Sequence, residues 1–277
     1  MHAHPYTSAA FALVTFWAVG VATTVAVADT ETGLIRDHPL YGRKLCSVVV
    51  PPLAVTGLAV PFLLDGHLLP SLSSWVFQSI PLMLPFAWIS WVWSRTWLRR
   101  TPAHRRRRLG RITVAVGIIG AVIAAHLALG QIDPPWREVL PMGILFATGA
   151  LLGSLTNFSL LALTAGLPSE VPGGPAQNLA SVTGAGFLMT LLVGGDVLLA
   201  FLQAPVWPQQ AVVLMQVWFF GSLIIPGLLL LSRLLPRHLP DSLITTAALV
   251  FAAGGQFAAL LMLFLYPGLV PPIEFGP

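Results

Sequence analysis

Charged residues are scarce in this chain. Lys, Arg, Asp and Glu make up only 9% of its 277 residues, whereas 56% of the residues are hydrophobic. A chain of this composition cannot cover a soluble globule with polar surface. The shortage of charge therefore argues against an ordinary soluble enzyme and indicates a membrane protein.

Several groups that define enzyme classes are also missing. The single cysteine, Cys46, permits no internal disulfide and no thiolate metal site. The sequence contains no Gly-rich phosphate loop, no HExxH, no CxxC and no GxSxG. The sequence therefore lacks the motifs that are typical of nucleotide hydrolases, zinc proteases and serine hydrolases. The only lysine, Lys44, lies outside the centres of the apolar runs, which argues against a retinal Schiff base.

Histidine pairs are absent from the apolar runs. Membrane b-type cytochromes hold each haem between two axial ligands. Here only His126, in AVIAAHLALG, lies clearly inside an apolar run. We therefore expect no haem in this chain.

What the sequence does have is a series of long apolar runs. Each is close to the ~20 residues that an α-helix needs to cross a hydrocarbon core of ~30 Å. They predict an all-α membrane protein, a bundle of eight transmembrane helices that forms one domain over residues 1–277. The runs cover 9–28, 46–64, 71–94, 111–130, 139–165, 179–202, 210–232 and 243–266.

The basic residues predict the orientation of these spans. Thirteen of the fourteen Lys and Arg residues fall in every second loop, and the opposite loops carry only Arg137. By the positive-inside rule, both termini then lie on the outer side of a prokaryotic cytoplasmic membrane. In the densest run, TWLRRTPAHRRRRLGR, the only Trp precedes the arginines and no aromatic residue interleaves them for base stacking, so we expect lipid and not nucleic acid as its partner. The thirteen residues are Arg36, Arg43, Lys44, Arg95, Arg99, Arg100, Arg105, Arg106, Arg107, Arg108, Arg111, Arg233 and Arg237.

The remaining polar residues gather towards the predicted outer side. The inner halves of the spans hold little beyond Asn157, with Gln256 near the middle of the last span. Because a carboxylate within a span is costly to retain, we expect Asp196 to face the bundle interior. The asymmetry predicts one polar cavity that opens outwards. Its residues are Asp65, His67, Gln78, His126, Gln131, Glu138, Asp196, Gln203 and Gln216.

Four segments resemble the NrfD-like polysulfide reductase membrane subunits. IDPPWREVLPMGILFATGALLGS is similar to the family's Pro-x-Trp, Leu-Pro and Phe-x-x-(Ser/Thr)-Gly pattern. LLDGHLLP and FFGSLIIPGLLL resemble a turn after the second span and a Gly-then-Pro pattern in the seventh. AALVFAAGGQFAALL resembles the eighth span, with Gln256 where the family often has Arg.

The resemblance implies a quinone-reacting membrane anchor of a three-part respiratory oxidoreductase. A ferredoxin-like iron–sulfur subunit would dock on the bundle, with a molybdopterin catalytic subunit beyond it. Electrons would pass between the iron–sulfur subunit and menaquinone or ubiquinone, and the metal centres would lie only in those partners. The terminal substrate and the direction of electron flow are not encoded in this chain.

The polar residues acquire roles under this hypothesis. Quinol oxidation releases two protons, and a histidine titrates near neutral pH, so His126 and Asp196 are the predicted catalytic pair. Asp133, Trp136 and Arg137 are predicted to form the docking mouth for the iron–sulfur subunit. The predicted quinone-binding residues are Asp65, His67, Gln131, Glu138 and Gln216.

Two other classes of function stay open. In a transporter, the same outer cavity would be a substrate vestibule, and spans five and seven do contain Pro141 and Pro226. We find no convincing repeat between 1–138 and 139–277, which a transporter often shows. A structural subunit of a membrane complex, without a site of its own, is the third class.

Overall fold

The fold is described from a computed structural model of the whole chain. It describes residues 5–30, 39–64, 75–99, 101–129, 139–165, 175–203, 207–232 and 240–266. Nearly all of them are helical, which confirms the predicted all-α class. The helices are α1 (Pro5–Thr30), α3 (Pro39–Lys44), the π-helix η1 (Leu45–Val49), α4 (Val50–Leu64), α5 (Trp75–Leu98), α6 (Ala103–Leu129), α7 (Val139–Ala165), α8 (Pro175–Gln203), α9 (Gln209–Phe219), the π-helix η3 (Phe220–Ile224), α10 (Ile225–Leu231) and α11 (Asp241–Leu265).

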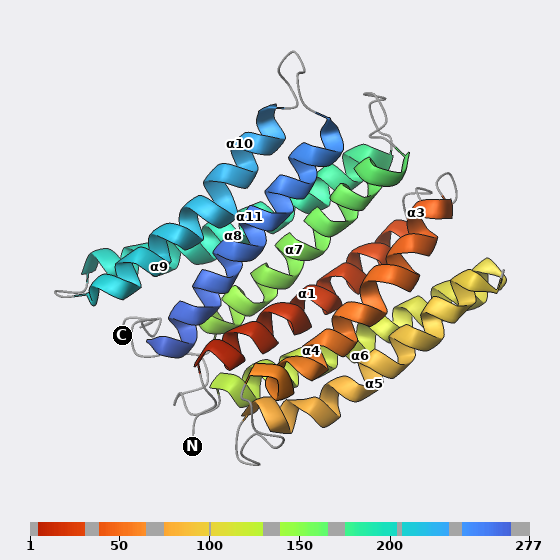
Figure 1. Cartoon of the computed structure of the whole chain (residues 1–277), viewed down its shortest axis with the longest axis horizontal. Helices are drawn as coiled ribbons and strands as arrows, with labels where there is room; N and C mark the ends of the chain where they lie inside the picture. The colour runs from red at the N-terminus through yellow and green to blue at the C-terminus, as the bar shows by residue number, and fades with distance from the viewer. Residues whose placement is uncertain are drawn as a thin grey trace, which may run out of the picture.

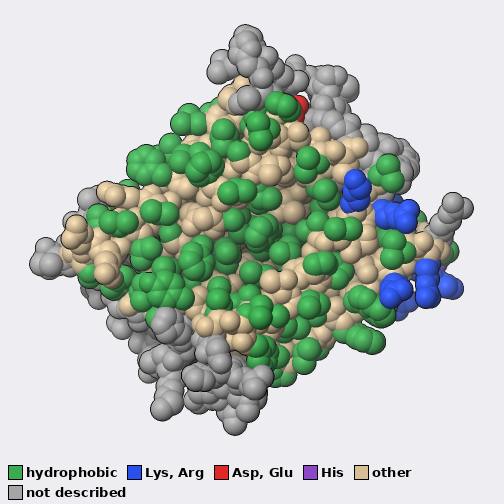
Figure 2. All heavy atoms as spheres, in the orientation of Figure 1, with side chains coloured by type: hydrophobic (Ala, Val, Ile, Leu, Met, Phe, Trp, Pro, Cys, Tyr) green, Lys and Arg blue, Asp and Glu red, His purple; other side chains and the backbone are tan. Residues whose placement is uncertain are grey.

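Seven helical segments among the described residues are long and apolar enough to cross a membrane. A further long helix, α8, carries an apolar stretch over Thr183–Leu199, the part of it whose side chains the structure describes. Hydrophobic side chains are spread across the whole described part of the face seen in Figure 2. The chain is therefore a multi-pass membrane protein.

Two helix starts differ clearly from the sequence prediction. The helical segment expected at 46–64 begins at Pro39, with α3 and η1 leading into α4. The span expected at 111–130 begins eight residues earlier, at Ala103, so Arg105 to Arg108 lie on a helix and not in a loop. Arginine is a good helix former, and its charged head is solvated beyond the hydrocarbon. The helix therefore continues through the arginine run.

Three helices form the centre of the bundle. The apolar part of α7 is 83% buried inside the protein, against 56% for α1 and α11 and 28% for α5. Figure 1 shows α1 and α7 side by side, with α4, α5 and α6 along one edge and α9 and α10 along the other. The packing of α8 involves mainly α7 and η3. The edge helices thus expose most of their surface to lipid.

Glycine permits the closest helix contacts. A Cβ added to Gly20 of α1 would collide with the backbone of Gly149 of α7, and one added to Gly255 of α11 would collide with Ser222 of η3. Helices in lipid associate by such close backbone approach, because the hydrophobic effect supplies little drive between them. These two crossings tie α1 to α7 and α11 to η3.

The two ends of the bundle differ in charge. We call the end where α5 finishes and α6 starts the basic end. Figure 2 shows Lys and Arg gathered at one edge of the molecule. We call the opposite end, where α1 and α9 begin and α11 finishes, the amide end. The described basic residues of the basic end are Arg43, Lys44, Arg95, Arg99, Arg105, Arg106, Arg107, Arg108 and Arg111.

Candidate functional site: a groove at the amide end

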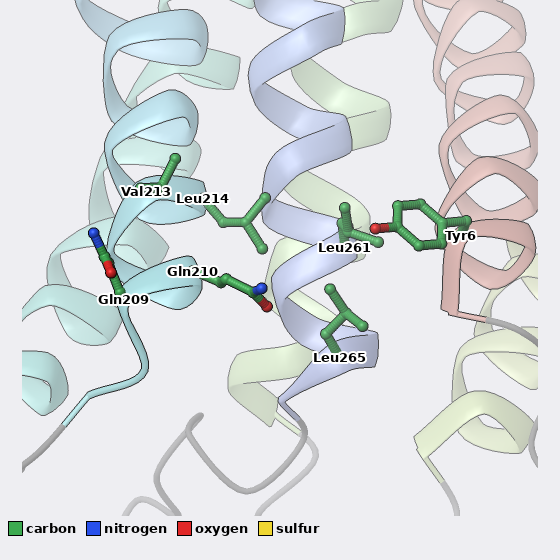
Figure 3. A pocket seen from close by; sticks show the side chains of 7 residues that line it. All are labelled: Tyr6, Gln209, Gln210, Val213, Leu214, Leu261 and Leu265. Atoms are coloured by element: carbon green, nitrogen blue, oxygen red, sulfur yellow. The ribbon is translucent and has the colours of Figure 1, made fainter.

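A groove opens at the amide end between α1, α9 and α11. Its cavity volume is about 380 Å³, within the range of ligand pockets. Figure 3 shows the leucines of α11 between the two amides of α9 and the phenol of α1. The groove therefore combines an apolar floor with a neutral polar rim. It is lined by Tyr6, Gln209, Gln210, Val213, Leu214, Leu261 and Leu265.

Local helix signals place the two amides. Pro208 precedes α9 with an extended ψ of 134°, so the helix starts directly at Gln209. The first turn closes on the Pro208 carbonyl, which accepts from the Ala211 N–H at 2.9 Å. Gln209 and Gln210 both lie in this turn and are exposed at the helix end.

A side-chain hydrogen bond joins the two helices at the groove. The hydroxyl of Tyr266, the residue after α11, donates to the Gln210 Oε1 at 2.9 Å. This bond occupies the carbonyl half of the amide and orients its NH₂ group. The NH₂ group of Gln210 can then donate to a ligand, because each Gln side chain carries two N–H donors.

A second polar group runs through the centre of the bundle, along α7. The Trp17 Nε1 donates to Thr156 Oγ1 at 2.7 Å, and Ser159 pairs with Thr246 at 2.9 Å. Asn157, fully buried, donates to the Gly153 carbonyl at 2.7 Å. The Trp17–Thr156 and Ser159–Thr246 bonds link α7 to α1 and α11, which indicates a structural role.

Gln256 is the least satisfied member of this central group. It is fully buried, and its Oε1 accepts from Thr148 Oγ1 at 2.8 Å while its Nε2 has no partner. The same Thr148 hydroxyl also lies 2.9 Å from the Ile144 carbonyl, although a hydroxyl has only one proton to donate. The reversed amide fits better: Nε2 would donate to Thr148, and Thr148 to Ile144. Nearby, the buried hydroxyl of Ser222 also lacks a partner.

The basic end holds an ion pair between a buried aspartate and a partly buried arginine. Asp29, whose side chain is 4% exposed, accepts from Arg106 Nη2 at 2.8 Å and from Arg106 Nε at 3.1 Å. The same guanidinium lies 4.0 Å from the centre of the Trp97 ring. The Asp29–Arg106 pair therefore joins the end of α1 to the start of α6, and the Trp97 ring adds the end of α5. The pair lies beside the buried Cys46.

The structure does not bring the predicted catalytic pair together. His126 is exposed on α6, which packs mainly against α5 and α1, and Asp196 is exposed on α8, which packs mainly against α7. The expectation that Asp196 faces the bundle interior is wrong. Its helix is at the margin, and the side of α8 that meets α7 carries Thr190 and Val197 instead.

The other predicted site residues lie elsewhere. Gln216 is exposed on α9 but does not line the groove. The remaining seven fall outside the described residues: Asp65, His67, Gln131, Asp133, Trp136, Arg137 and Glu138.

Sequence reasoning missed the residues that do line the groove. Tyr6 lies before the first predicted apolar run, 9–28, and the two glutamines lie at the start of the seventh, 210–232. Uncharged side chains at span ends are common and carry no signal alone. The Pro-Gln-Gln step was the available clue, because proline fixes a helix start and so places the next residues at the membrane surface.

Within the described ranges, no group of three or more His, Cys, Asp or Glu residues could hold a metal ion. The described lining of the groove offers hydrogen-bonding side chains and apolar contact. Comparison of the chain with protein-family models, with curated proteins and with solved structures finds no match.

Proposed function

We propose that this chain is the quinone-binding membrane anchor of a respiratory oxidoreductase and that the groove at the amide end receives the quinone head group. In this proposal the chain crosses a prokaryotic cytoplasmic membrane eight times with both termini outside. The arginine asymmetry supports that orientation. The amide end, with the groove, then lies at the outer surface.

The observation that carries the proposal is the composition of the groove. A quinone ring has two carbonyl oxygens that accept hydrogen bonds and two apolar faces with an isoprenoid tail. Gln209 and Gln210 supply amide groups on one side of the groove, while Leu261 and Leu265 of α11 supply apolar lining. An opening at the membrane boundary admits a ligand from the lipid, with its tail left in the bilayer.

The redox chemistry belongs to partner subunits. Electrons would pass between the quinone and an iron–sulfur subunit docked at the same end, with a molybdopterin subunit beyond. The groove itself offers donors to the ring oxygens, and its open side offers water as the route for the two protons of a quinol.

Two glutamines on one helix provide the test. We expect Gln210→Leu to weaken binding of a short-chain menaquinone or ubiquinone by roughly threefold to tenfold, the scale of one net hydrogen bond. Gln216→Leu, on α9 but outside the groove, should leave the affinity unchanged. Binding would be measured by titration of the purified protein in nanodiscs. Equal losses in both variants, or no loss in either, would contradict the groove as the head-group site.

A transporter is the second candidate, favoured by the interruption in the seventh span. There α9 gives way to the π-helix η3 and then to α10, with Pro226 in its first turn and the unpaired Ser222 hydroxyl facing α11. Irregular turns of this kind are frequent at functional sites in membrane helices. Solute uptake by proteoliposomes that Gln256→Leu abolishes, with quinone binding absent, would favour this alternative.

A further inference from the structure

Two arginines of the basic end lie over tryptophan rings, and they differ in their acidic partners. Arg106 lies 4.0 Å from the centre of the Trp97 ring and pairs with Asp29. Arg95 lies 4.5 Å from the centre of the Trp91 ring, and no acidic residue of the described ranges pairs with it. Because Arg95 is exposed, its guanidinium can bind an anion from outside the chain.

Arg95 stands at the end of an exposed stripe on α5. The stripe begins with an aliphatic side chain, continues with two indoles and ends with the guanidinium. The two indole rings lie 5.6 Å apart, and they are 67% and 44% exposed. A phospholipid has the same order of chemistry, from acyl chains through the glycerol esters to the phosphate, and tryptophan prefers the level of the head groups. The stripe consists of Leu84, Trp88, Trp91 and Arg95, at helical spacings of three or four residues.

Further positive charges surround the end of α5. Arg99 stands one turn beyond Arg95, and its backbone N–H donates to the Arg95 carbonyl at 3.1 Å. The short helix α3 ends with Arg43 and Lys44 and packs against α5 at the same end of the bundle (Figure 1). All these side chains are exposed, and the described part of the chain gives them no acidic partner. The end of α5 therefore lacks a counter-charge from the described residues.

We propose that this end of α5 binds the phosphate of an anionic phospholipid. Arg95 donates to the two unesterified phosphate oxygens, which match the parallel N–H groups of a guanidinium. The Trp91 ring holds the guanidinium in place. The acyl chains lie along Trp88 and Leu84.

Two observations favour an anionic lipid as the occupant. The apolar part of α5 is only 28% buried inside the protein, so the stripe below Arg95 faces the bilayer. A soluble anion would use the arginine and leave the exposed indoles without a role. A zwitterionic lipid would bring its own cation towards Arg99 and Lys44, whereas an anionic lipid adds only negative charge.

Titration with a short-chain phosphatidylglycerol tests the site. Delipidated protein in a neutral detergent is titrated, and native mass spectrometry counts the bound lipid molecules. Arg95→Gln should weaken binding of the first lipid by roughly fivefold, the scale of one basic residue near anionic lipid. Trp91→Leu should weaken it by roughly twofold to fivefold, the scale of an exposed cation–π contact. Phosphatidylcholine of the same chain length should bind more weakly than phosphatidylglycerol.

Arg108→Gln is the matched control. Trp93 of α5 lies 3.0 Å from the Cβ position of Gly110 of α6, and Arg95 and Arg108 each stand two residues from this contact, towards the basic end. The two arginines therefore lie at a similar depth. Both are exposed, but no described ring lies under Arg108, so its substitution should leave the affinity nearly unchanged.

Three results would overturn the proposal. Equal losses for Arg95→Gln and Arg108→Gln would show diffuse attraction by the whole basic end. Equal affinity for phosphatidylcholine would show that the lipid charge is not recognised. Displacement of the lipid by millimolar inorganic phosphate would show a site for a free anion and not for a lipid.

Discussion

The two ends of the bundle accommodate their polar side chains in different ways. At the basic end, Asp29 is almost completely buried, and Arg106 occupies its two oxygens while stacking on Trp97. At the amide end, Gln209 and Gln210 carry no charge and stand exposed beside an open groove. An ion pair holds the helices together at the basic end, and exposed neutral amides can bind a ligand at the amide end.

The difference has a simple electrostatic origin. Removing one partner of a buried ion pair leaves the other charge unpaired, which costs much free energy. Such a pair is therefore suited to holding helices in a fixed arrangement. An amide can exchange one hydrogen-bond partner for another at a small net cost, so it suits a site that must release its ligand. The basic end should therefore govern stability, and the amide end should govern quinone binding.

The largest expected difference between the ends is in their accessibility, because the amide end should face the outside and the basic end the cytoplasm. In a Cys46→Ser background, Gln209→Cys should react with an impermeant maleimide added outside intact cells, whereas Ala103→Cys should react only in inverted vesicles. Both positions are exposed at helix starts, so reactivity depends on the side and not on burial. Labelling of Ala103→Cys alone from outside would reverse the proposed orientation.

The next largest effect is expected at the ion pair. Asp29→Ala leaves Arg106 without its acceptor, and we expect the free energy of unfolding to fall by about 3 kcal/mol. The buried thiol of Cys46 provides a native reporter, because a thiol-reactive dye reaches it only when the bundle opens. Thermal unfolding in detergent with such a dye would measure the change.

Arg107→Ala is the control for this prediction. Its Nε lies 3.8 Å from Asp29 and its side chain is 44% exposed, so the loss should stay below about 1 kcal/mol. A loss as large as that of Asp29→Ala would show that the arginine run stabilises the bundle collectively and not through one pair.

Much of the fold could be predicted from the sequence, because lipid imposes a length and a composition on every crossing. The span at 139–165 was predicted with the bounds that α7 has, and the others agree at most ends within a few residues. The start of α6 could not be predicted this way. Arginine is excluded from hydrocarbon but not from a helix, so hydropathy marks where the membrane ends and not where the helix does.

The candidate site was less accessible to sequence reasoning. Position along each span predicts how deep a side chain lies in the membrane. The direction in which each side chain points depends on which helices are neighbours, and that information is not local. Asp29 was missed for the same reason, since its significance comes from Arg106, 77 residues away.

A smaller effect is expected from the aromatic partner of the ion pair. Trp97→Leu removes the ring over which Arg106 lies, and the free energy of unfolding should fall by about 1 kcal/mol or somewhat more. Trp97→Phe should recover part of the loss, because the Trp97 Nε1 has no partner to lose and the phenyl face still attracts the cation. If Trp97→Phe is as damaging as Trp97→Leu, the cation–π contact does not contribute.

The smallest change in stability, and the most informative about the amide end, is expected for Tyr266→Phe. It deletes only the hydroxyl that donates to Gln210, an exposed hydrogen bond whose loss should cost about 0.5 kcal/mol. Without that bond, Gln210 is free to rotate, so quinone affinity should fall by roughly twofold to threefold although the groove keeps its shape. Dye-based unfolding and quinone titration of the same preparation give the two numbers. A stability loss without an affinity loss would show that Tyr266 merely closes the helix end and does not orient Gln210.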